Sequence, residues 1–331
     1  MPYFYIAGMP KCGTTDLYDR LTRQPEVLTG VIKEPHWWTR KRFGAFHPQT
    51  YNSSTSSTTT KHASFDDYVD LFDEAAVEIA GSVDEDAEMR SRKIIVDASA
   101  SLLWDNDGWL NFLNWKLRSE NKIESSSGKD PFPPLIVSHL KNLHPKSKLI
   151  VMLRDPVKRL YSDYLYFRLK GDKTVDNFHD RVVKSVDAFR ACTRMHNLRS
   201  CVYAPEVHNV GRVVSSLSTK RASTSVRLRI GMYSVFLRDW FDQFPRDQIL
   251  VLRLEDYAAK TKEALRNIFQ FLGISSDGRS EEERREEIRN KHYLDIGPMK
   301  NETETLLREF YADYNADLAS LLNDKNFLWK D

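Results

Sequence analysis

The sequence predicts an α/β fold with three layers, in which a central parallel sheet is flanked by helices. Apolar runs rich in β-branched residues alternate with longer segments of helical periodicity along the 331-residue chain. The first apolar run also leads directly into a turn with two glycines and then into a helical segment, an arrangement that binds anions in such folds. These two observations are the basis of the predicted fold class.

Four runs are expected to form buried parallel strands, because continuous apolar character suits a sheet that is covered on both faces. They are Tyr3–Ala7, Ile94–Asp97, Leu149–Leu153 and Ile249–Leu254. Helical periodicity predicts further elements between and after these runs. The clearest helices are Phe65–Ile79, Pro134–Leu143, Val157–Leu169, Met232–Phe244, Lys262–Leu272 and Glu302–Leu322.

The chain shows no internal repeat and no clean boundary, so we expect one domain over residues 1–331. Stretches rich in Ser, Thr, Gly or Pro predict loops at 51–61, 124–134 and 210–225. The formal net charge is only +2, so local basic patches would have to meet any polyanionic partner, and we expect no nucleic acid. No run of about 18 apolar residues is present, and Met1 directly precedes the first expected strand. We therefore expect neither a membrane span nor a signal peptide within this chain.

Residues 8–15, with the sequence Gly-Met-Pro-Lys-Cys-Gly-Thr-Thr, predict an anion-binding loop. A helix start offers unpaired N–H groups and the positive end of its dipole, and glycine lets the backbone approach a ligand closely. In an ATP- or GTP-binding loop the lysine directly follows the last glycine, whereas Lys11 stands two residues before Gly13. The loop is therefore expected to bind phosphate or sulfate, but not as an ordinary ATP or GTP loop.

A second group of residues follows the third expected strand. That strand ends at Arg154, and Pro156 is placed to begin a helix that carries Ser162. Arg154 and Ser162 are expected to reach one ligand group, since arginine contacts phosphate through several donors. An arginine at a strand end can equally form a structural ion pair. With the Lys11 loop on a neighbouring strand, two anion sites would face one crevice, which suits a nucleotide with phosphates at both ends.

The third group is Lys-Glu-Pro-His-Trp-Trp at residues 33–38, followed by Arg40, Lys41 and Arg42. Glu34 is a candidate general base whose pKa is tuned by the adjacent cations and by burial. Trp37 and Trp38 are candidates for a surface that stacks on sugar rings. The alternative is a surface turn with buried tryptophans.

The chain has three cysteines, of which Cys12 lies in the anion loop. Cys192 and Cys201 are close enough in sequence for a short-loop disulfide in an oxidising compartment, and two unrelated thiols are the alternative. Sequons at Asn52 and Asn301 are candidate N-glycosylation sites and support a secretory location only weakly.

Together the three groups resemble the Golgi carbohydrate sulfotransferases that use 3′-phosphoadenosine 5′-phosphosulfate (PAPS). Residues 10–15 resemble the 5′-phosphosulfate loop of that family, and Arg154–Ser162 resembles its 3′-phosphate motif. Residues 33–38 are similar to the Lys-Glu-x-His-aromatic-aromatic segment of its glycosaminoglycan O-sulfotransferases. The resemblance implies a sulfotransferase fold related to P-loop NTPases. It covers nearly the whole chain, through residues 98–106, 151–167, 252–256, 297–299 and the final helix to Trp329.

The resemblance implies in-line transfer of a sulfuryl group from PAPS to a sugar hydroxyl, with PAP as product and no metal. Glu34 would take the proton from that hydroxyl, Lys11 would stabilise the charge on the bridging oxygen, and His36 would orient the acceptor or Glu34. The resemblance also implies a disulfide between Cys192 and Cys201. The donor-binding residues that it implies are Lys11, Cys12, Gly13, Thr14, Thr15, Arg154, Ser162 and Tyr233.

The implied acceptor is a sulfated glycosaminoglycan, at O6 of N-acetylgalactosamine 4-sulfate in chondroitin or dermatan sulfate. Heparan-modifying relatives often carry a lysine after the second strand, where this chain has Ala98, so heparan sulfate is the weaker alternative. Expected acceptor contacts are Trp37, Trp38, Arg40, Ser99, Ser101, Trp104 and Arg168. Further basic side chains are either acceptor contacts or solvated surface charges; they are Lys41, Arg42, Lys170, Lys173, Arg227 and Arg229.

The family's location implies the Golgi lumen and an upstream membrane anchor that is absent from this chain. The same motifs argue against two other function classes. The position of Lys11 and the Arg154 motif argue against a P-loop kinase. The presence of both Lys11 and Glu34 argues against a glycosaminoglycan-binding protein without catalytic activity.

Overall fold

The computed structural model describes residues 1–46, 62–81, 93–119, 133–167, 173–203, 225–275 and 296–330. The chain divides into two compact units, and the single domain expected from the sequence stays a prediction. Unit 1 comprises Met1–Met9, Gly13–Met152 and Asp239–Glu282. Unit 2 comprises Pro10–Cys12, Leu153–Arg238 and Glu283–Asp331. In the described ranges, no helix is long and apolar enough to cross a membrane.

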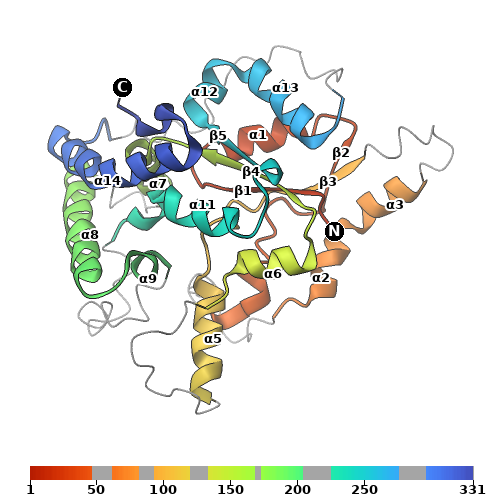
Figure 1. Ribbon diagram of the computed structural model, residues 1–331, viewed down its shortest axis with the longest axis horizontal. Helices are drawn as coiled ribbons and strands as arrows, with labels where there is room; N and C mark the ends of the chain where they lie inside the picture. The colour runs from red at the N-terminus through yellow and green to blue at the C-terminus, as the bar shows by residue number, and fades with distance from the viewer. Residues whose placement is uncertain are drawn as a thin grey trace. The chain divides into compact units, whose positions relative to one another are not determined.

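A five-stranded sheet with the order β2-β3-β1-β4-β5 forms the centre of unit 1. Strand β1 pairs in parallel with β3 and with β4, and β2 pairs in parallel with β3. Helices α1, α12 and α13 lie on one side of this sheet and α6 lies on the other, which confirms the three-layer α/β prediction (Figure 1). The strands are β1 (Phe4–Gly8), β2 (Val27–Thr29), β3 (Ile94–Asp97), β4 (Lys148–Leu153) and β5 (Ile249–Arg253). The helices are α1 (Thr14–Leu21), α6 (Ile136–Leu143), α12 (Leu254–Ala259) and α13 (Thr261–Leu272).

The central strands are buried on both faces, as their continuous apolar sequences predict. Every residue of β1 and of β3 is buried, and so is all of β4 except Lys148. Strand β2 was not predicted from the sequence. It has three residues, too few for a periodic pattern, and only its pairing with β3 identifies it as a strand.

Unit 1 contains further helical elements besides those that flank the sheet. The helix expected at Phe65–Ile79 is broken into three pieces, and it begins with a capping box between Ser64 and Asp67. Helix α5 follows β3 and was not predicted. These elements are η1 (Lys41–Phe46), α2 (Phe65–Val69), η2 (Asp70–Phe72), α3 (Asp73–Gly81), α5 (Asp107–Ser119) and η7 (Arg246–Gln248).

Unit 2 is helical, and α14 packs against both α7 and α8. Its interior holds a fully buried arginine, Arg159, which donates a hydrogen bond of 2.9 Å to the carbonyl oxygen of Arg227. The elements are α7 (Pro156–Phe167), α8 (Val175–Met195), α9 (Leu198–Tyr203), η6 (Leu228–Gly231), α11 (Tyr233–Phe241), α14 (Asn301–Leu322) and η9 (Lys325–Leu328). Helix α11 continues from unit 2 into unit 1 at Asp239.

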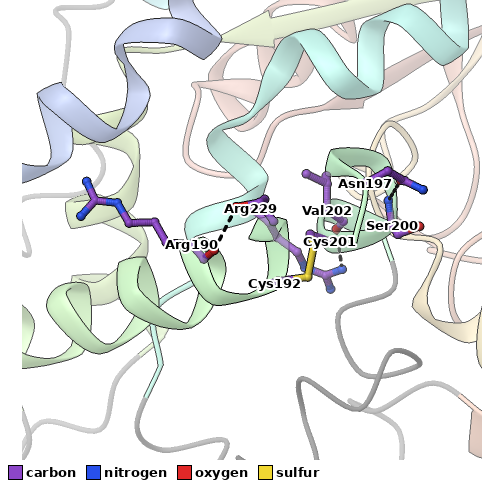
Figure 2. The surroundings of a disulfide bond; sticks show 8 residues. Arg190, Cys192, Asn197, Ser200, Cys201, Val202 and Arg229 are labelled. Carbon is purple, nitrogen blue, oxygen red and sulfur yellow. Dashed lines mark hydrogen bonds between the residues drawn. A yellow bond between two sulfur atoms is a disulfide. The ribbon is translucent and has the colours of Figure 1, made fainter. Parts of the chain in front are cut away.

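A disulfide between Cys192 and Cys201 confirms the pairing that the family resemblance implies (Figure 2). It joins the last turns of α8 to α9, a helix of only six residues. Arg229 donates to the carbonyl oxygens of Val202 and Tyr203 at 3.0 and 3.2 Å, and so caps the C-terminal end of α9. Arg229 therefore has a structural role in unit 2.

Five other predicted helices are present with shifted ends, as α6, α7, α11, α13 and α14. Leu169, which ends one of the expected helices, lies outside the described residues. So do the loop expected at 51–61, most of the loops at 124–134 and 210–225, the sequon residue Asn52, and the basic residues Arg168 and Lys170. The second sequon residue, Asn301, is the exposed first residue of α14.

Candidate active site

The anion loop leads from β1 into α1, and Gly13 is the N-cap residue directly before the helix. Gly13 has φ +83°, in the left-handed region that glycine adopts without strain. A Cβ atom at this position would also lie 2.7 Å from Cδ1 of Leu254 in α12. Thr14 is buried at the start of α1, whereas Thr15 is exposed. The glycine is therefore required twice, by backbone conformation and by close packing.

Lys33 connects the start of α1 to Glu34 within unit 1. Its Nζ atom donates to Oγ1 of Thr15 at 3.0 Å and lies 3.8 Å from Oε1 of Glu34. Lys33 is not one of the site residues expected from the sequence. Its position directly before Glu34 in the motif is the signal that could have identified it. The structure thus brings a second lysine to the helix start that carries Thr14 and Thr15.

Glu34 and His36 form a pair in the same turn. Nε2 of His36 lies 3.4 Å from Oε2 of Glu34, and both residues have left-handed backbones with φ +50° and +55°. Burial alone would raise the pKa of Glu34. The hydrogen bond from His36 and the charges of His36, Lys33 and Arg40 outweigh burial and hold that pKa below its usual value. Glu34 is therefore a carboxylate at neutral pH, as a general base must be.

Ser99 and Ser101 hold His36 from the segment after β3. The backbone N–H of His36 donates to Oγ of Ser99 at 2.9 Å, and Nδ1 of His36 is hydrogen-bonded to Oγ of Ser101 at 2.7 Å. Ser101 is also hydrogen-bonded to Oγ1 of Thr39 at 2.8 Å. Both serines are buried. Ser99 and Ser101, which we expected to contact the acceptor, are therefore hydrogen-bonded to His36. A direct contact of either serine with the acceptor stays a prediction.

The two tryptophans of the motif are core residues, with exposed fractions of 6% for Trp37 and 2% for Trp38. Trp37 stacks on Tyr68 with ring centroids 4.8 Å apart, and its Nε1 donates to backbone carbonyls. This burial agrees with the alternative of buried tryptophans and leaves little ring surface for a sugar, so a contact of either ring with acceptor stays a prediction. The rings anchor the turn that carries Glu34 and His36.

Arg40 donates through Nε to Oδ2 of the buried Asp105 at 2.8 Å. This ion pair positions the arginine, whose charge also lowers the pKa of Glu34. Arg42 lies 5.0 Å from the ring centroid of Trp37, and Trp104 is buried. Contacts of Arg40 or Trp104 with acceptor remain predictions.

In unit 2, Arg154 lies beside the anion-loop lysine. Its Nη1 donates to the carbonyl oxygen of Lys11 at 3.3 Å, and its own carbonyl oxygen accepts from the hydroxyl of Tyr233 at 2.9 Å. Tyr233 is buried, and burial raises the pKa of its hydroxyl, which stays a donor. Tyr233 thus positions the backbone of Arg154. The expected approach of Arg154 and Ser162 to one ligand group stays a prediction.

Helix α7 begins at Pro156, as expected, and Asp155 caps it. The Asp155 carboxylate accepts from the N–H of Val157 at 2.8 Å, which fixes the direction of the helix that carries Ser162.

Cys12 is buried, and its Sγ lies 3.7 Å from the carbonyl oxygen of Pro10. Arg227 is bound through two N–H groups to the carboxylate of Asp163, so it forms a structural ion pair.

Lys11 has a left-handed backbone with φ +66°. Burial, together with the charges of Arg154 and Arg227, lowers the pKa of Lys11 to about 8, against the opposing effect of Asp163. A lysine whose pKa lies this close to neutral pH is unusual at a protein surface. So low a pKa is typical of an ammonium group that is held close to other cations at an anion site.

A protein-family model described as "Sulfotransferase domain" matches residues 2–304 of the chain. The chain belongs to this sulfotransferase domain family. Human and mouse proteins named carbohydrate sulfotransferase 15 are 41% and 40% identical to this chain, over its whole length. The chain spans about half the length of these curated relatives, 55% in each case.

A solved sulfotransferase from Alicyclobacillus acidocaldarius has the same fold. It superposes with a TM-score of 0.54 at 19% identity and covers 98% of this chain and 96% of its own. The fold prediction is therefore confirmed. The family also implies a sulfonate donor. Among the described residues, no three His, Cys, Asp or Glu side chains gather as metal ligands would.

Proposed function

We propose that this sulfotransferase transfers a sulfuryl group from PAPS to a glycosaminoglycan hydroxyl, at O6 of N-acetylgalactosamine 4-sulfate. The names of the human and mouse relatives support a carbohydrate acceptor. One observation carries the proposal. The Nζ of Lys33 lies between the carboxylate of Glu34 and the hydroxyl of Thr15 at the helix start, with an ion-pair distance of 3.8 Å to the first and a hydrogen bond of 3.0 Å to the second.

The loop residues fit the phosphosulfate end of PAPS. A Cβ atom at Gly13 would lie 2.7 Å from Leu254, so only glycine fits before α1; the first N–H groups of α1 and Lys33, which donates to Thr15, supply positive potential at this helix start. When bound, PAPS supplies the activated sulfuryl group and leaves as PAP. Thr14 and Thr15 hold the 5′-phosphate, and Arg154 and Ser162 hold the 3′-phosphate.

Glu34 accepts the proton of the acceptor hydroxyl as that oxygen attacks sulfur. His36 holds the second oxygen of the carboxylate, and Ser101 in turn holds the imidazole, so the base is oriented before the acceptor arrives. Lys11 and Lys33 stabilise the negative charge that develops on the bridging oxygen. The residues of the site thus supply proton transfer, orientation and charge stabilisation.

The acceptor is tested by transfer of labelled sulfate from PAPS to chondroitin 4-sulfate, dermatan sulfate, unsulfated chondroitin and heparan sulfate, followed by disaccharide analysis. We expect a 4,6-disulfated galactosamine unit from the first two substrates. Transfer to heparan sulfate alone would overturn the acceptor assignment and keep the reaction class. Absence of transfer from PAPS to any sugar would overturn the proposal as a whole.

The donor is tested with Arg154→Ala and two ligands that differ only at the 3′ position. Loss of a charge-assisted contact predicts PAP binding that is about 10- to 100-fold weaker. Adenosine 5′-phosphate, which is PAP without its 3′-phosphate, serves as the matched control and should bind parent and variant alike. Equal affinity of parent and variant for PAP would show that Arg154 does not hold the 3′-phosphate.

The disulfide supports a location in an oxidising compartment, and we propose the Golgi lumen. Free thiols at Cys192 and Cys201 in the protein isolated from its natural source would contradict this location. Mass spectrometry of the unreduced protein distinguishes the two states. The same spectra show whether Asn52 and Asn301 carry glycans.

A further inference from the structure

The last turn of α7 presents two aromatic rings, and a cation lies over each. Tyr166 and Phe167 end the helix, with exposed fractions of 50% and 56%. Nζ of Lys11 lies 3.7 Å from the ring centroid of Tyr166, and the guanidinium of Arg227 lies 4.1 Å from that of Phe167. All four residues belong to unit 2. Of the two cations, only Lys11 lies in the anion loop.

The charged groups around Lys11 leave its ammonium poorly compensated. Arg154 and Arg227 disfavour the charged form, while Asp163 and Cys12 favour it. Asp163 is, however, already bound by Arg227 through two N–H groups and lies 3.8 Å from Nη1 of Arg159. Its carboxylate is therefore shared among several cations. Burial disfavours the ammonium further and is the largest contribution to the pKa of about 8.

The face of an aromatic ring stabilises such an ammonium without adding a proton acceptor. The negative quadrupole of the ring attracts the cation, and the attraction grows as the pair leaves water. This attraction acts directly on Nζ of Lys11, which lies over the ring of Tyr166.

We propose that Tyr166 is a positioning residue that holds the ammonium of Lys11 through its ring face and keeps it protonated. The contact itself follows from the geometry, and its use in sulfuryl transfer rests on the proposed function. The ring is the part that acts. Tyr166→Phe should therefore preserve the effect, whereas Tyr166→Leu should remove it.

The first test measures the proton affinity of Lys11 without any reaction. Trace acetylation at a series of pH values, with mass spectrometry of the peptide that contains Lys11, reports the pKa of its amine. Tyr166→Leu should lower the proton affinity about three- to tenfold, which is about half a pKa unit to one unit. Tyr166→Phe should stay within about twofold of the parent. Leucine is chosen over alanine because a smaller side chain would also hydrate the ammonium and raise its pKa.

Phe167→Leu is the matched control, since it removes the neighbouring exposed ring and the contact with Arg227 but leaves the Lys11 contact in place. The proposal is overturned if Tyr166→Leu leaves the pKa of Lys11 unchanged. It is also overturned if Tyr166→Phe lowers that pKa as much as leucine does, because the hydroxyl would then be responsible.

The second test follows kcat/KM for PAPS against pH. Lys11 acts as a cation, so activity is lost as pH rises through its pKa, and this loss should begin at a lower pH in Tyr166→Leu. A shifted amine pKa without a shifted activity profile would overturn the catalytic use of the contact. If no variant, nor the parent, uses PAPS, the proposed function fails, while the acetylation result still decides the Lys11–Tyr166 contact.

Discussion

The three residues expected to do the chemistry share an unfavourable backbone. Lys11, Glu34 and His36 have φ values of +66°, +55° and +50°, in a region that side chains with a Cβ atom rarely adopt. Such conformations persist only where the surrounding structure enforces them, and they concentrate at functional sites. At Glu34 and His36, the buried rings of Trp37 and Trp38 and the hydrogen bonds of His36 with Ser99 and Ser101 enforce this conformation. The strain is thus concentrated at the residues to which we assign the proposed reaction.

Glu34→Gln should lower kcat by about 10²- to 10⁴-fold, because the amide keeps the shape of the carboxylate but does not accept the proton. The rate of labelled sulfate transfer at saturating acceptor measures the effect. Glu74→Gln, at an exposed position of α3, is the matched control and should keep the parental rate. A Glu34→Gln variant that retains more than about a tenth of the parental rate would remove Glu34 as the base.

The pH dependence at the acid side is a second prediction at this scale. The pKa of Glu34 lies below its usual value, so activity is present above that pKa and is lost as pH falls through it. Lys33→Met removes one of the charges that lower the pKa and should move the acid limb of kcat/KM to higher pH by a few tenths of a unit to about one unit. Lys146→Met, an exposed position of unit 1, should not move it. An unchanged limb in Lys33→Met would mean that Lys33 does not act on Glu34.

At the scale of elements, the junction between β1 and α1 determines whether the anion loop forms. The strand is buried over its whole length, and the helix begins at the one residue that tolerates both a positive φ and contact with Leu254. Gly273 offers a natural comparison, since it ends α13 with φ +77° and has open space around its Cα.

Gly13→Ala should destabilise the protein more than Gly273→Ala does. Both variants incur the conformational cost of a positive φ, about 1 kcal/mol, while Gly13→Ala adds overpacking against Leu254 of about 1–3 kcal/mol. Urea unfolding of both variants measures the difference, and PAP binding should fall only in Gly13→Ala. Equal stability of the two would show that the loop yields to the added methyl group.

At the scale of the whole molecule, each unit has its own means of holding together. Unit 1 relies on the buried sheet, whereas the helices of unit 2 are joined by α14, the buried Arg159 and the disulfide. The disulfide closes a short loop with a sequence separation of 9, and α9 has too few residues to be stable alone.

The double variant Cys192→Ser/Cys201→Ser should lose about 2–3 kcal/mol of unfolding free energy, as loop-closure entropy predicts for so short a loop. Urea unfolding under non-reducing conditions measures it. The parent protein under reducing conditions should show the same loss, which controls for the serine side chains. If the denaturation midpoint does not change in either case, the disulfide does not contribute to stability.

Much of the fold and site was accessible from the sequence because the signals are local. The alternation of apolar runs and helical segments gave the layers, and the strand-turn-helix around Gly13 gave the anion loop. Strand β2 has too few residues for a periodic pattern. Helices α5 and α8 were not predicted either, although the buried residues Phe178, Val182 and Val186 of α8 stand four apart, as on one face of a helix.

The sequence by itself determined the fold class, the loop at residues 8–15, the base candidate Glu34 and, through resemblance, the disulfide. Only the tertiary structure decided which side chains meet. Lys33 reaches Thr15 across 18 residues, and His36 reaches Ser101 across 65. It also decided that Trp37 and Trp38 are core and that Tyr166 lies under Lys11. The reason is physical: periodicity and capping act within a few residues, whereas these contacts depend on how distant elements pack.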